Sequence, residues 1–292
     1  MPTRDPRRAG RHRLPWLARI VVVAIVVGVV VSGFVAWRAA QRAFFVASCA
    51  ATASGTTFTF TPEQTANAAL ISAVAVKRGL PPRAATIAIA TAIQESKLRN
   101  LTFGDRDSVG LFQQRPSQGW GTREQILDPV YSTQKFYDAL MKIAGYATAP
   151  ITEVAQQVQH SAFPEAYADH EQQGRVLAST LTGQSPAALG CRLAGPTAVS
   201  TVDAVATDLT TQMGIGAAAS SGVVRVSAPD PAHAWAAAQW AVARADAYGV
   251  ARVEVAGRTW DRSDGSSALT WGSGGSGGAG DATTVTIRLG AT

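Results

Sequence analysis

The sequence of 292 residues has few of the residues that build metal centres or nucleophilic active sites. It contains two cysteines and four histidines, and the histidines lie far apart, at positions 12, 160, 170 and 233. No Gly-x-Ser-x-Gly elbow joins a strand pattern to a helix pattern, which excludes a serine nucleophile of the α/β-hydrolase type. The glycine-rich run at residues 272–280 has no lysine and no following helix, so it is not a phosphate-binding loop. We therefore expect no metal and no cofactor.

Charged residues are also few, at 16% of the chain, and their balance gives a formal net charge of +6. Residues 1–19 hold six arginines and one aspartate, so this segment carries +5 and the rest of the chain only +1. A domain that binds nucleic acid carries its positive charge on its folded surface. The charge balance therefore gives no reason to expect a nucleic-acid partner.

One long hydrophobic run follows this basic segment. Residues 20–37 contain no charged side chain, and at about 1.5 Å rise per residue their helix is just long enough to cross a bilayer. The preceding arginines predict that residues 1–19 stay in the cytoplasm and that the globular part lies outside. A cleaved signal peptide is one alternative, and a lipidated Cys49 is another. Arg38 and Arg42 separate Cys49 from the run, so a single-pass anchor in the cell membrane is the better interpretation.

The two cysteines fit an extracytoplasmic location. Cys49 lies just after the hydrophobic run, and Cys191 lies at the end of the first globular region. Outside the cell, a pair of cysteines predicts a disulfide, with two free thiols as the alternative. Closing so long a loop stabilises a fold by about 4–5 kcal/mol in the chain-entropy account.

The stretch around which the chain is organised is a predicted helix at residues 82–97. It opens with a proline, and residues 84–93 are apolar or small apart from two threonines, which is typical of a buried helix. Its last turn nevertheless carries Glu95. Loss of water and the negative end of the helix dipole both raise the pKa of such a carboxyl group, as a general acid near neutral pH requires. Lys97 or Arg99 would lower that pKa by folding back onto it.

Two motifs follow one another along this part of the chain. Glu95-Ser96 ends the buried helix, and Gly110-Leu111-Phe112-Gln113 follows after a polar loop, in a predicted hairpin. This ordered pair resembles the lysozyme-like lytic transglycosylase family, in which a Glu-Ser pair precedes a Gly-Leu-Met-Gln segment. Here Phe112 stands in place of the methionine. The resemblance covers about residues 58–191 and implies a lysozyme-like domain that acts on the glycan strands of peptidoglycan.

The resemblance also implies a mechanism and a set of contact residues. Glu95 would protonate the glycosidic oxygen between N-acetylmuramic acid and N-acetylglucosamine. It would then take the proton from the muramoyl 6-hydroxyl, leaving a 1,6-anhydro end. The residues expected to contact substrate are Ser96, Gly110, Leu111, Phe112, Gln113, Gln159 and Tyr131.

Several of these assignments have a plainer alternative. Ser96 either orients Glu95 or touches substrate, or it is a satisfied hydroxyl at a helix end. Gln113 either binds an N-acetyl sugar or bonds to its own backbone. Val158-Gln159 corresponds to a Tyr-Asn pair of the family, so the tyrosine is missing here. Tyr131 and Tyr167 are candidate platforms for a sugar ring, or ordinary core residues.

Two other interpretations of the function stay open. A catalytically inactive protein of the same fold could bind peptidoglycan or serve as a scaffold, with Glu95 exposed and salt-bridged. A hydrolase could use Asp105 or Asp107 as a second carboxylate, as many glycosidases do. A lytic transglycosylase needs no second carboxylate, and the sequence fits this one-acid scheme better. The expected partners are glycan strands and the plasma membrane.

Helix and strand patterns divide the remainder of the chain. Residues 58–191 predict the mainly helical (α+β) lysozyme-like domain, flanked by linkers at 38–57 and 192–200. Its expected helices cover about residues 62–78, 82–97, 129–143, 151–162 and 164–182, with a short helix opening at Thr122.

Residues 201–292 predict a small α/β domain whose role the sequence leaves open. Its expected elements are helices at 202–213 and 231–248 and strands at 223–227, 251–255 and 283–289. The strands alternate apolar and polar residues, as half-buried strands do. A stripe on the second helix is expected to cover the sheet, formed by Trp235, Gln239, Trp240, Ala243 and Ala247.

Overall fold

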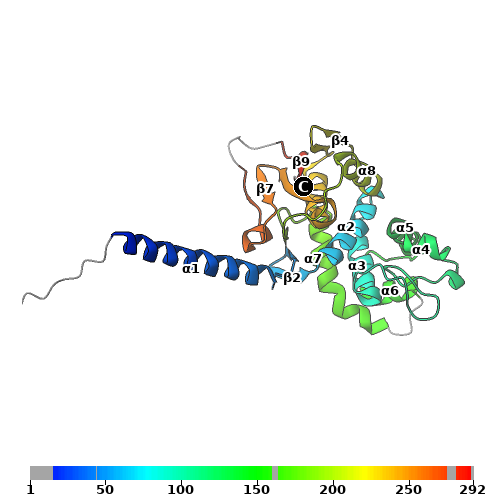
Figure 1. The fold of residues 1–292 in the computed structure, drawn as a ribbon. Coiled ribbons are helices and arrows are strands. Elements are labelled where there is room, and N and C mark those ends of the chain that lie inside the picture. The colour runs from blue at the N-terminus through cyan, green and yellow to red at the C-terminus, as the bar shows by residue number, and fades with distance from the viewer. Residues whose placement is uncertain (1–15, 44, 160–163, 275–280, 291–292) are drawn as a thin grey trace, which may run out of the picture. The chain divides into compact units, whose positions relative to one another are not determined.

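The computed structural model describes residues 16–43, 45–159, 164–274 and 281–290 (Figure 1). The chain divides into two units, one ending at Val46 and one beginning at Ala47. Helices and strands both contribute to the second unit, so the predicted mixed α/β class is confirmed. Most of the predicted cytoplasmic tail, residues 1–15, lies outside the described residues.

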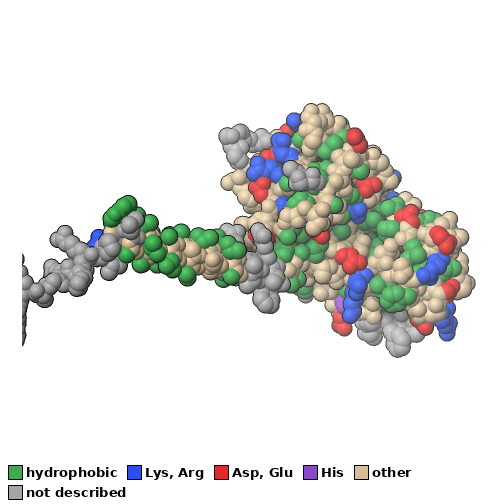
Figure 2. All heavy atoms as spheres, in the orientation of Figure 1, with side chains coloured by type: hydrophobic (Ala, Val, Ile, Leu, Met, Phe, Trp, Pro, Cys, Tyr) green, Lys and Arg blue, Asp and Glu red, His purple; other side chains and the backbone are tan. Residues whose placement is uncertain are grey.

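The first unit is the helix α1, which spans Trp16–Ala43. Within it, Ala18–Trp37 has a mean hydropathy of 2.8 and none of its hydropathy window is buried. Hydrophobic side chains cover the visible face of this helix (Figure 2). The helix is therefore long and apolar enough to cross a membrane, and a signal sequence near the N-terminus has the same properties.

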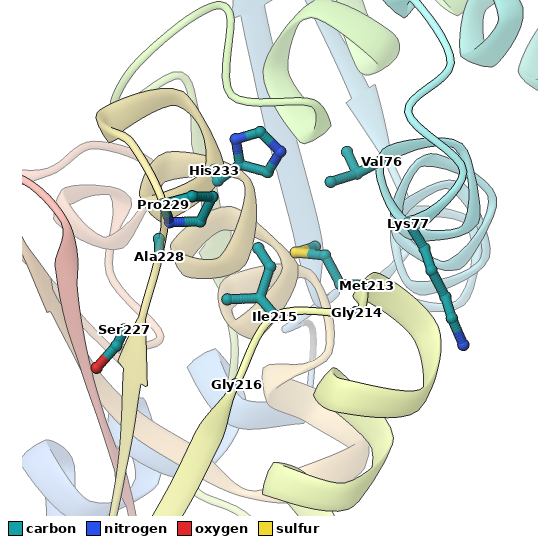
Figure 3. A pocket seen from close by; sticks show the side chains of 10 residues that line it. All are labelled: Val76, Lys77, Met213, Gly214, Ile215, Gly216, Ser227, Ala228, Pro229 and His233. Atoms are coloured by element: carbon teal, nitrogen blue, oxygen red, sulfur yellow. The ribbon is translucent and has the colours of Figure 1, made fainter.

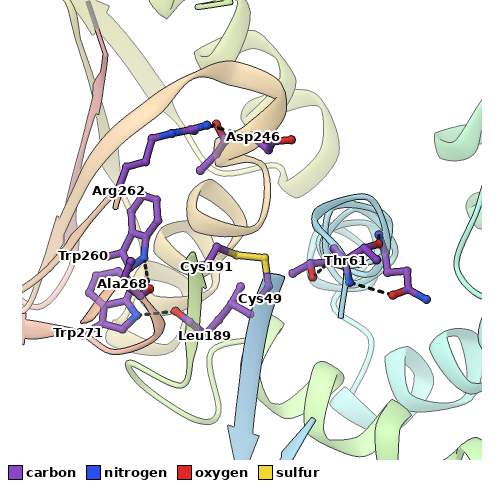
Figure 4. Close-up of a disulfide and its surroundings, with 12 residues drawn as sticks. Cys49, Thr61, Leu189, Cys191, Asp246, Trp260, Arg262, Ala268 and Trp271 are labelled. Carbon is purple, nitrogen blue, oxygen red and sulfur yellow. Dashed lines mark hydrogen bonds and ion pairs between the residues drawn. A yellow bond between two sulfur atoms is a disulfide. The ribbon is translucent and has the colours of Figure 1, made fainter. Parts of the chain in front are cut away.

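The second unit begins with a three-stranded antiparallel sheet that joins distant parts of the chain. Its strand order is β2-β1-β3, with β1 at Ser48–Ala53, β2 at Thr56–Phe60 and β3 at Leu189–Arg192. Cys49 and Cys191 face each other across the β1–β3 pair and form a disulfide (Figure 4). The predicted disulfide is confirmed. The segment expected to be a linker at 38–57 instead contains β1 and the start of β2.

The helices between these strands follow the sequence prediction closely. Capping boxes at Thr61 and Thr122 and prolines at first helical positions fix where α2, α3, α4 and α5 begin. The helix predicted at 164–182 is instead a 3₁₀ segment followed by an α-helix. The elements are α2 Pro62–Lys77, α3 Pro82–Ser96, η1 Pro116–Gln118, α4 Arg123–Leu127, α5 Pro129–Leu140, α6 Ile151–Gln159, η2 Pro164–His170 and α7 Glu171–Leu181.

A six-stranded antiparallel sheet dominates the C-terminal part, in the order β4-β5-β9-β6-β7-β8. The predicted helices and strands are all present, and the helix predicted at 231–248 is interrupted at Arg244. Three short strands were not predicted: β4, β7 and β8. The elements are α8 Val202–Met213, β4 Ala217–Ser220, β5 Val223–Ser227, α9 Pro231–Ala243, α10 Ala245–Tyr248, β6 Val250–Val255, β7 Arg258–Asp261, η3 Ser266–Leu269, β8 Gly272–Ser273 and β9 Thr284–Leu289.

Helix α9 joins the C-terminal sheet to the helices of the preceding part. Every residue from Ala234 to Ala243 is buried, because α9 packs against β6 and β9 and also against α2, α7 and β3. The side chain of Gln239 is fully buried and bonds backbone groups of the α7–β3 connection. Trp271 adds a hydrogen bond from its indole to the Leu189 carbonyl. The predicted apolar stripe is wrong at Ala247, which is exposed.

Candidate active site

The site begins at the C-terminal end of α3, where the chain leaves a buried helix. Lys97 and Leu98 both adopt left-handed backbone conformations, with φ of 55° and 57°. The amide of Leu98 donates to the Ala92 carbonyl, and the Leu98 side chain is fully buried. This C-cap turns the chain sharply away from the helix axis and anchors it in the core. Glu95 is thereby held on the last turn of a helix whose end cannot fray freely.

Glu95 is only partly exposed, and two side chains from later in the chain hold it. The hydroxyl of Tyr167 in η2 donates to Oε1 of Glu95 at 2.6 Å. The side chain of Gln159 at the end of α6 also hydrogen-bonds the carboxyl group. Tyr167 is 1% exposed, so its hydroxyl is fixed by the packing of its ring. Three elements, α3, α6 and η2, thus converge on one carboxyl group.

Burial and hydrogen bonding act on the pKa of Glu95 in opposite directions. Loss of water is the larger effect and raises the pKa above the usual value for glutamate. The hydrogen bonds from Tyr167 and Gln159 favour the ionised form and offset part of that rise. Neither Lys97 nor Arg99 is among the groups that shift the pKa of Glu95, and Arg99 lies 3.7 Å from Glu63 instead. The carboxyl group of Glu95 therefore keeps its proton to a higher pH than an exposed glutamate, and the two donors are in place to stabilise the carboxylate when the proton leaves.

Gln159 also connects the acid to the second motif. Its Nε2 donates to the Phe112 carbonyl at 2.7 Å, while the same side chain reaches Glu95. The structure therefore brings together Glu95, Gln159 and the backbone of the Gly110–Gln113 segment, which the sequence predicted as parts of one site. His160 and the three residues after it lie outside the described residues.

Ser96, Leu111 and Phe112 have structural roles rather than the predicted substrate contacts. The Ser96 side chain is buried, and its hydroxyl donates to the Leu111 carbonyl at 2.7 Å and to the Ala92 carbonyl at 3.0 Å. The side chains of Leu111 and Phe112 are fully buried, and Phe112 stacks on Phe136. No ligand in solvent can reach these side chains. The plainer alternative for Ser96, a satisfied hydroxyl at the helix end, fits the structure.

Gly110 and Gln113 shape the loop that carries the second motif. Gly110 has φ of 82°, and a Cβ there would lie 2.9 Å from the Ile126 carbonyl oxygen, so only glycine fits. The side-chain amide of Gln113 donates to the Gly110 carbonyl at 3.2 Å, which fits the alternative that this residue bonds to the backbone of its own segment. The predicted hairpin is reduced to isolated bridges, Val109 with Gln114 and Leu101 with Gly110. Gln113 is half-buried, so part of its side chain still faces solvent.

Tyr131 lies in α5 and is tied to the Trp120 region. Its hydroxyl donates to the Trp120 carbonyl at 3.3 Å, and its ring lies against Gly121. Lys135 lies above the same ring, 5.4 Å from its centroid. Tyr131 is half-exposed, and none of these contacts connects it to Glu95. Its assignment as a substrate contact stays a prediction.

The two candidate second carboxylates are occupied elsewhere or open to solvent. Asp107 accepts hydrogen bonds from the Ser117 amide at 2.8 Å and from Arg115 at 3.0 Å, and these contacts lower its pKa. The lowered pKa keeps Asp107 ionised, as a nucleophile or base requires, but both carboxylate oxygens already accept hydrogen bonds from Arg115 and Ser117. The Asp105 side chain is 90% exposed beside Arg106. Neither contacts Glu95, Tyr167 or Gln159 among the interactions of the described residues.

Tyr167 is the site residue whose role the sequence did not reveal. It was predicted only as a sugar platform or a core residue, yet its hydroxyl bonds the acid 72 positions earlier. The only signal was a tyrosine in the polar segment after α6, near the glutamine assigned to the site. Sequence spacing alone could not place it, because η2 brings it back onto α3 through tertiary packing.

Two pockets of about 420 Å³ each lie in the described part of the chain. One pocket lies beside the C-terminal end of α3, and its lining includes Gln94, Lys97, His170 and Gln173. The other lies between α2 and the C-terminal part, where the His233 ring faces Val76 and Met213 and Lys77 points away (Figure 3). His233 there is paired with Asp230 at 2.8 Å.

Among the described residues, no group of three or more His, Cys, Asp or Glu side chains could hold a metal ion.

The sequence matches no protein-family model and no curated protein.

Proposed function

We propose that this chain is a membrane-anchored, lytic transglycosylase-like enzyme that cleaves peptidoglycan between N-acetylmuramic acid and N-acetylglucosamine outside the cytoplasm. The observation that carries the proposal is the environment of Glu95. It is a partly buried acid with a raised pKa, held by two uncharged hydrogen-bond donors and by no second carboxylate among the described residues.

This environment suits an acid that must act twice in one cycle. Before cleavage, loss of water keeps the proton on Glu95, so the group can protonate the glycosidic oxygen. After that transfer, the Tyr167 hydroxyl and the Gln159 amide stabilise the carboxylate that remains. The carboxylate then takes a proton from the muramoyl 6-hydroxyl as that oxygen attacks the anomeric carbon, and the acid is restored.

The absence of a second carboxylate among the partners of Glu95 favours this internal attack over hydrolysis. Glycosidases with two carboxylates use the second one as a nucleophile or as a base for water. Asp107 is held by Arg115 and Ser117, and Asp105 is exposed, so neither is presented beside Glu95 by the described contacts. An attacking hydroxyl within the substrate removes the need for either.

The anchor and the disulfide support an extracytoplasmic location. Disulfides persist in oxidising compartments, and Cys49–Cys191 closes a separation of 142 residues. The arginines that precede the apolar helix favour a cytoplasmic N-terminus, which leaves the globular unit on the side of the cell wall.

The test is digestion of purified peptidoglycan by the full-length chain in lipid nanodiscs, with products identified by mass. We expect 1,6-anhydro products, lighter by one water than reducing-end products. Glu95→Gln should lower the rate by about 10²-fold or more, because the amide cannot transfer the proton. Glu153→Gln on the exposed face of α6 is the matched control and should leave the rate unchanged.

Each other outcome identifies a different function. Reducing-end products would identify a hydrolase. Glycan binding without cleavage, by the wild type and Glu95→Gln alike, would identify a peptidoglycan-binding or scaffold protein. Equal cleavage rates in the wild type and Glu95→Gln would remove Glu95 from the mechanism.

A further inference from the structure

Phe103 is an unusually exposed aromatic residue in the globular unit. Its side chain is 71% exposed, and the other large hydrophobic side chain exposed in the described part of residues 47–292 is Met141, at 48%. Burying a phenylalanine ring stabilises a fold, and this position forgoes that gain. Single exposed apolar residues are common on proteins, so the exposure alone indicates no function.

Contacts on both sides of Phe103 hold the backbone of its loop in place. The Arg123 guanidinium donates to the Thr102 carbonyl, immediately before Phe103. The Gln113 amide lies 3.5 Å from the carbonyl oxygen of Phe103 itself. Gly104 packs so closely on the Gln113 side chain that a Cβ there would lie 1.9 Å from its Oε1. The backbone is therefore fixed while the ring projects into solvent, which is an ordered platform rather than a loose loop tip.

A short series of contacts connects the Phe103 loop to Glu95. Gln113 directly follows Phe112, whose carbonyl accepts the hydrogen bond from Gln159. Gln159 in turn bonds Glu95. The exposed ring is thus attached to the same loop that Gln159 ties to Glu95.

The chemistry of the surrounding loop favours a sugar over a lipid. Asp105 and Arg106 follow the ring closely and are largely exposed, with side chains 90% and 72% accessible. A charged pair of this kind opposes insertion into hydrocarbon. A pyranose ring instead presents an apolar face of C–H groups surrounded by hydroxyls, which suits an aromatic ring framed by polar residues.

We propose that Phe103 is the stacking platform for a sugar ring of the glycan strand, at a position beside the bond that Glu95 cleaves. The inference rests on the proposed function and adds a specificity-determining residue to it. The stack contributes ground-state binding away from the reacting atoms, so its loss should change affinity much more than the rate of the chemical step.

The experiment measures binding of a β-1,4-linked N-acetylglucosamine hexamer by calorimetry, with the full-length Glu95→Gln chain in nanodiscs. Adding Phe103→Ala should weaken binding by about tenfold, which corresponds to ~1.4 kcal/mol. Phe103→Trp should restore it, because the larger ring keeps the stacking face. Met141→Ala is the matched control, and it should leave the affinity unchanged. In the active chain, Phe103→Ala should raise KM with kcat within twofold of wild type.

The outcomes separate the platform from the proposed function. If Glu95→Gln binds the hexamer and Phe103→Ala binds it equally well, the platform is overturned while the enzyme proposal stands. If Glu95→Gln does not bind the hexamer, the platform is overturned, and the digestion of peptidoglycan decides separately whether the proposed function stands. The exposed site leaves the fold intact, so a melting temperature equal to that of the parent is expected.

Discussion

Replacing Gln239 with leucine tests whether the C-terminal part folds as one cooperative unit with the part that holds Glu95. The Gln239 side chain is fully buried in α9 and satisfies four backbone groups. Its Oε1 accepts from the amides of Ala188 and Leu189 at 2.9 and 3.0 Å. Its Nε2 donates to the carbonyls of Thr180 and Ser185 at 2.6 and 3.2 Å. Leucine has a similar volume and supplies none of these bonds.

The size of the effect follows from which backbone groups lose their only partner. The Thr180 carbonyl also accepts from the Gly183 amide, so it keeps a hydrogen bond. The Leu189 amide would be left unpaired in the interior, and the Ala188 amide and the Ser185 carbonyl would lose their partner in part-buried positions. A fully buried unpaired group costs about 1–3 kcal/mol and a part-buried one less, so we expect a loss of about 2–4 kcal/mol. That is a large fraction of the stability of a typical domain.

The assay is urea unfolding of the full-length chain, followed by tryptophan fluorescence and by peptidoglycan-cleaving activity in parallel. Gln134→Leu makes the same replacement on the exposed face of α5 and should change stability by less than about 0.5 kcal/mol. We expect Gln239→Leu to lower the midpoints of fluorescence and activity together. A variant in which the C-terminal tryptophans unfold first while activity persists would refute the reasoning, because the two parts would then be independent.

Two further predictions concern the acid and its pH dependence. In Tyr167→Phe, the hydrogen bond that favours the carboxylate is lost, so the pKa of Glu95 should rise further. The alkaline limb of the pH–rate profile should then move to higher pH, while kcat falls by about 10–100-fold. An unchanged pH–rate profile would show that the Tyr167 hydroxyl does not act on Glu95. Because the folded-state pKa of Glu95 is raised, its contribution to stability is complete below the unfolded pKa and is lost as pH rises through the folded pKa. Glu95→Gln should therefore melt at a higher temperature than wild type near neutral pH, with the difference disappearing in acid; a lower melting temperature at neutral pH would contradict the raised pKa.

Local chemistry made much of the fold predictable. Capping residues and prolines mark helix starts that depend on the nearest four residues, and α2, α3, α4 and α5 begin where those signals lie. Strands β5, β6 and β9 alternate apolar and polar residues and were found for the same reason. Two of the missed strands, β4 and β8, lack such a signal. β4 is Ala-Ala-Ala-Ser, whose residues have little strand preference, and β8 has two residues.

Long-range contacts account for what the sequence could not predict. The sequence of α9 is apolar on almost all sides, which is typical of a buried helix, but nothing local indicates that α2 and α7 cover the face away from the sheet. Likewise, Leu111 and Phe112 belong to a motif associated with a cleft, yet their side chains point into the core. Residue type and spacing identified the segment, whereas the direction of each side chain depended on tertiary packing.

The departure of this chain from the family pattern at Val158 now has a physical explanation within the proposed function. The resemblance associates a tyrosine and an amide with the side of the cleft opposite the acid, and here the position of that tyrosine is a buried valine. The amide is retained as Gln159, which bonds both Glu95 and the Phe112 carbonyl. A tyrosine hydroxyl also reaches the acid, but Tyr167 supplies it from η2. What the chemistry requires is a donor at Glu95 Oε1 in a site with little water, and two different segments can deliver that atom. The loss of one motif residue therefore does not argue against catalysis, because Tyr167 supplies a tyrosine hydroxyl to Glu95 from another element.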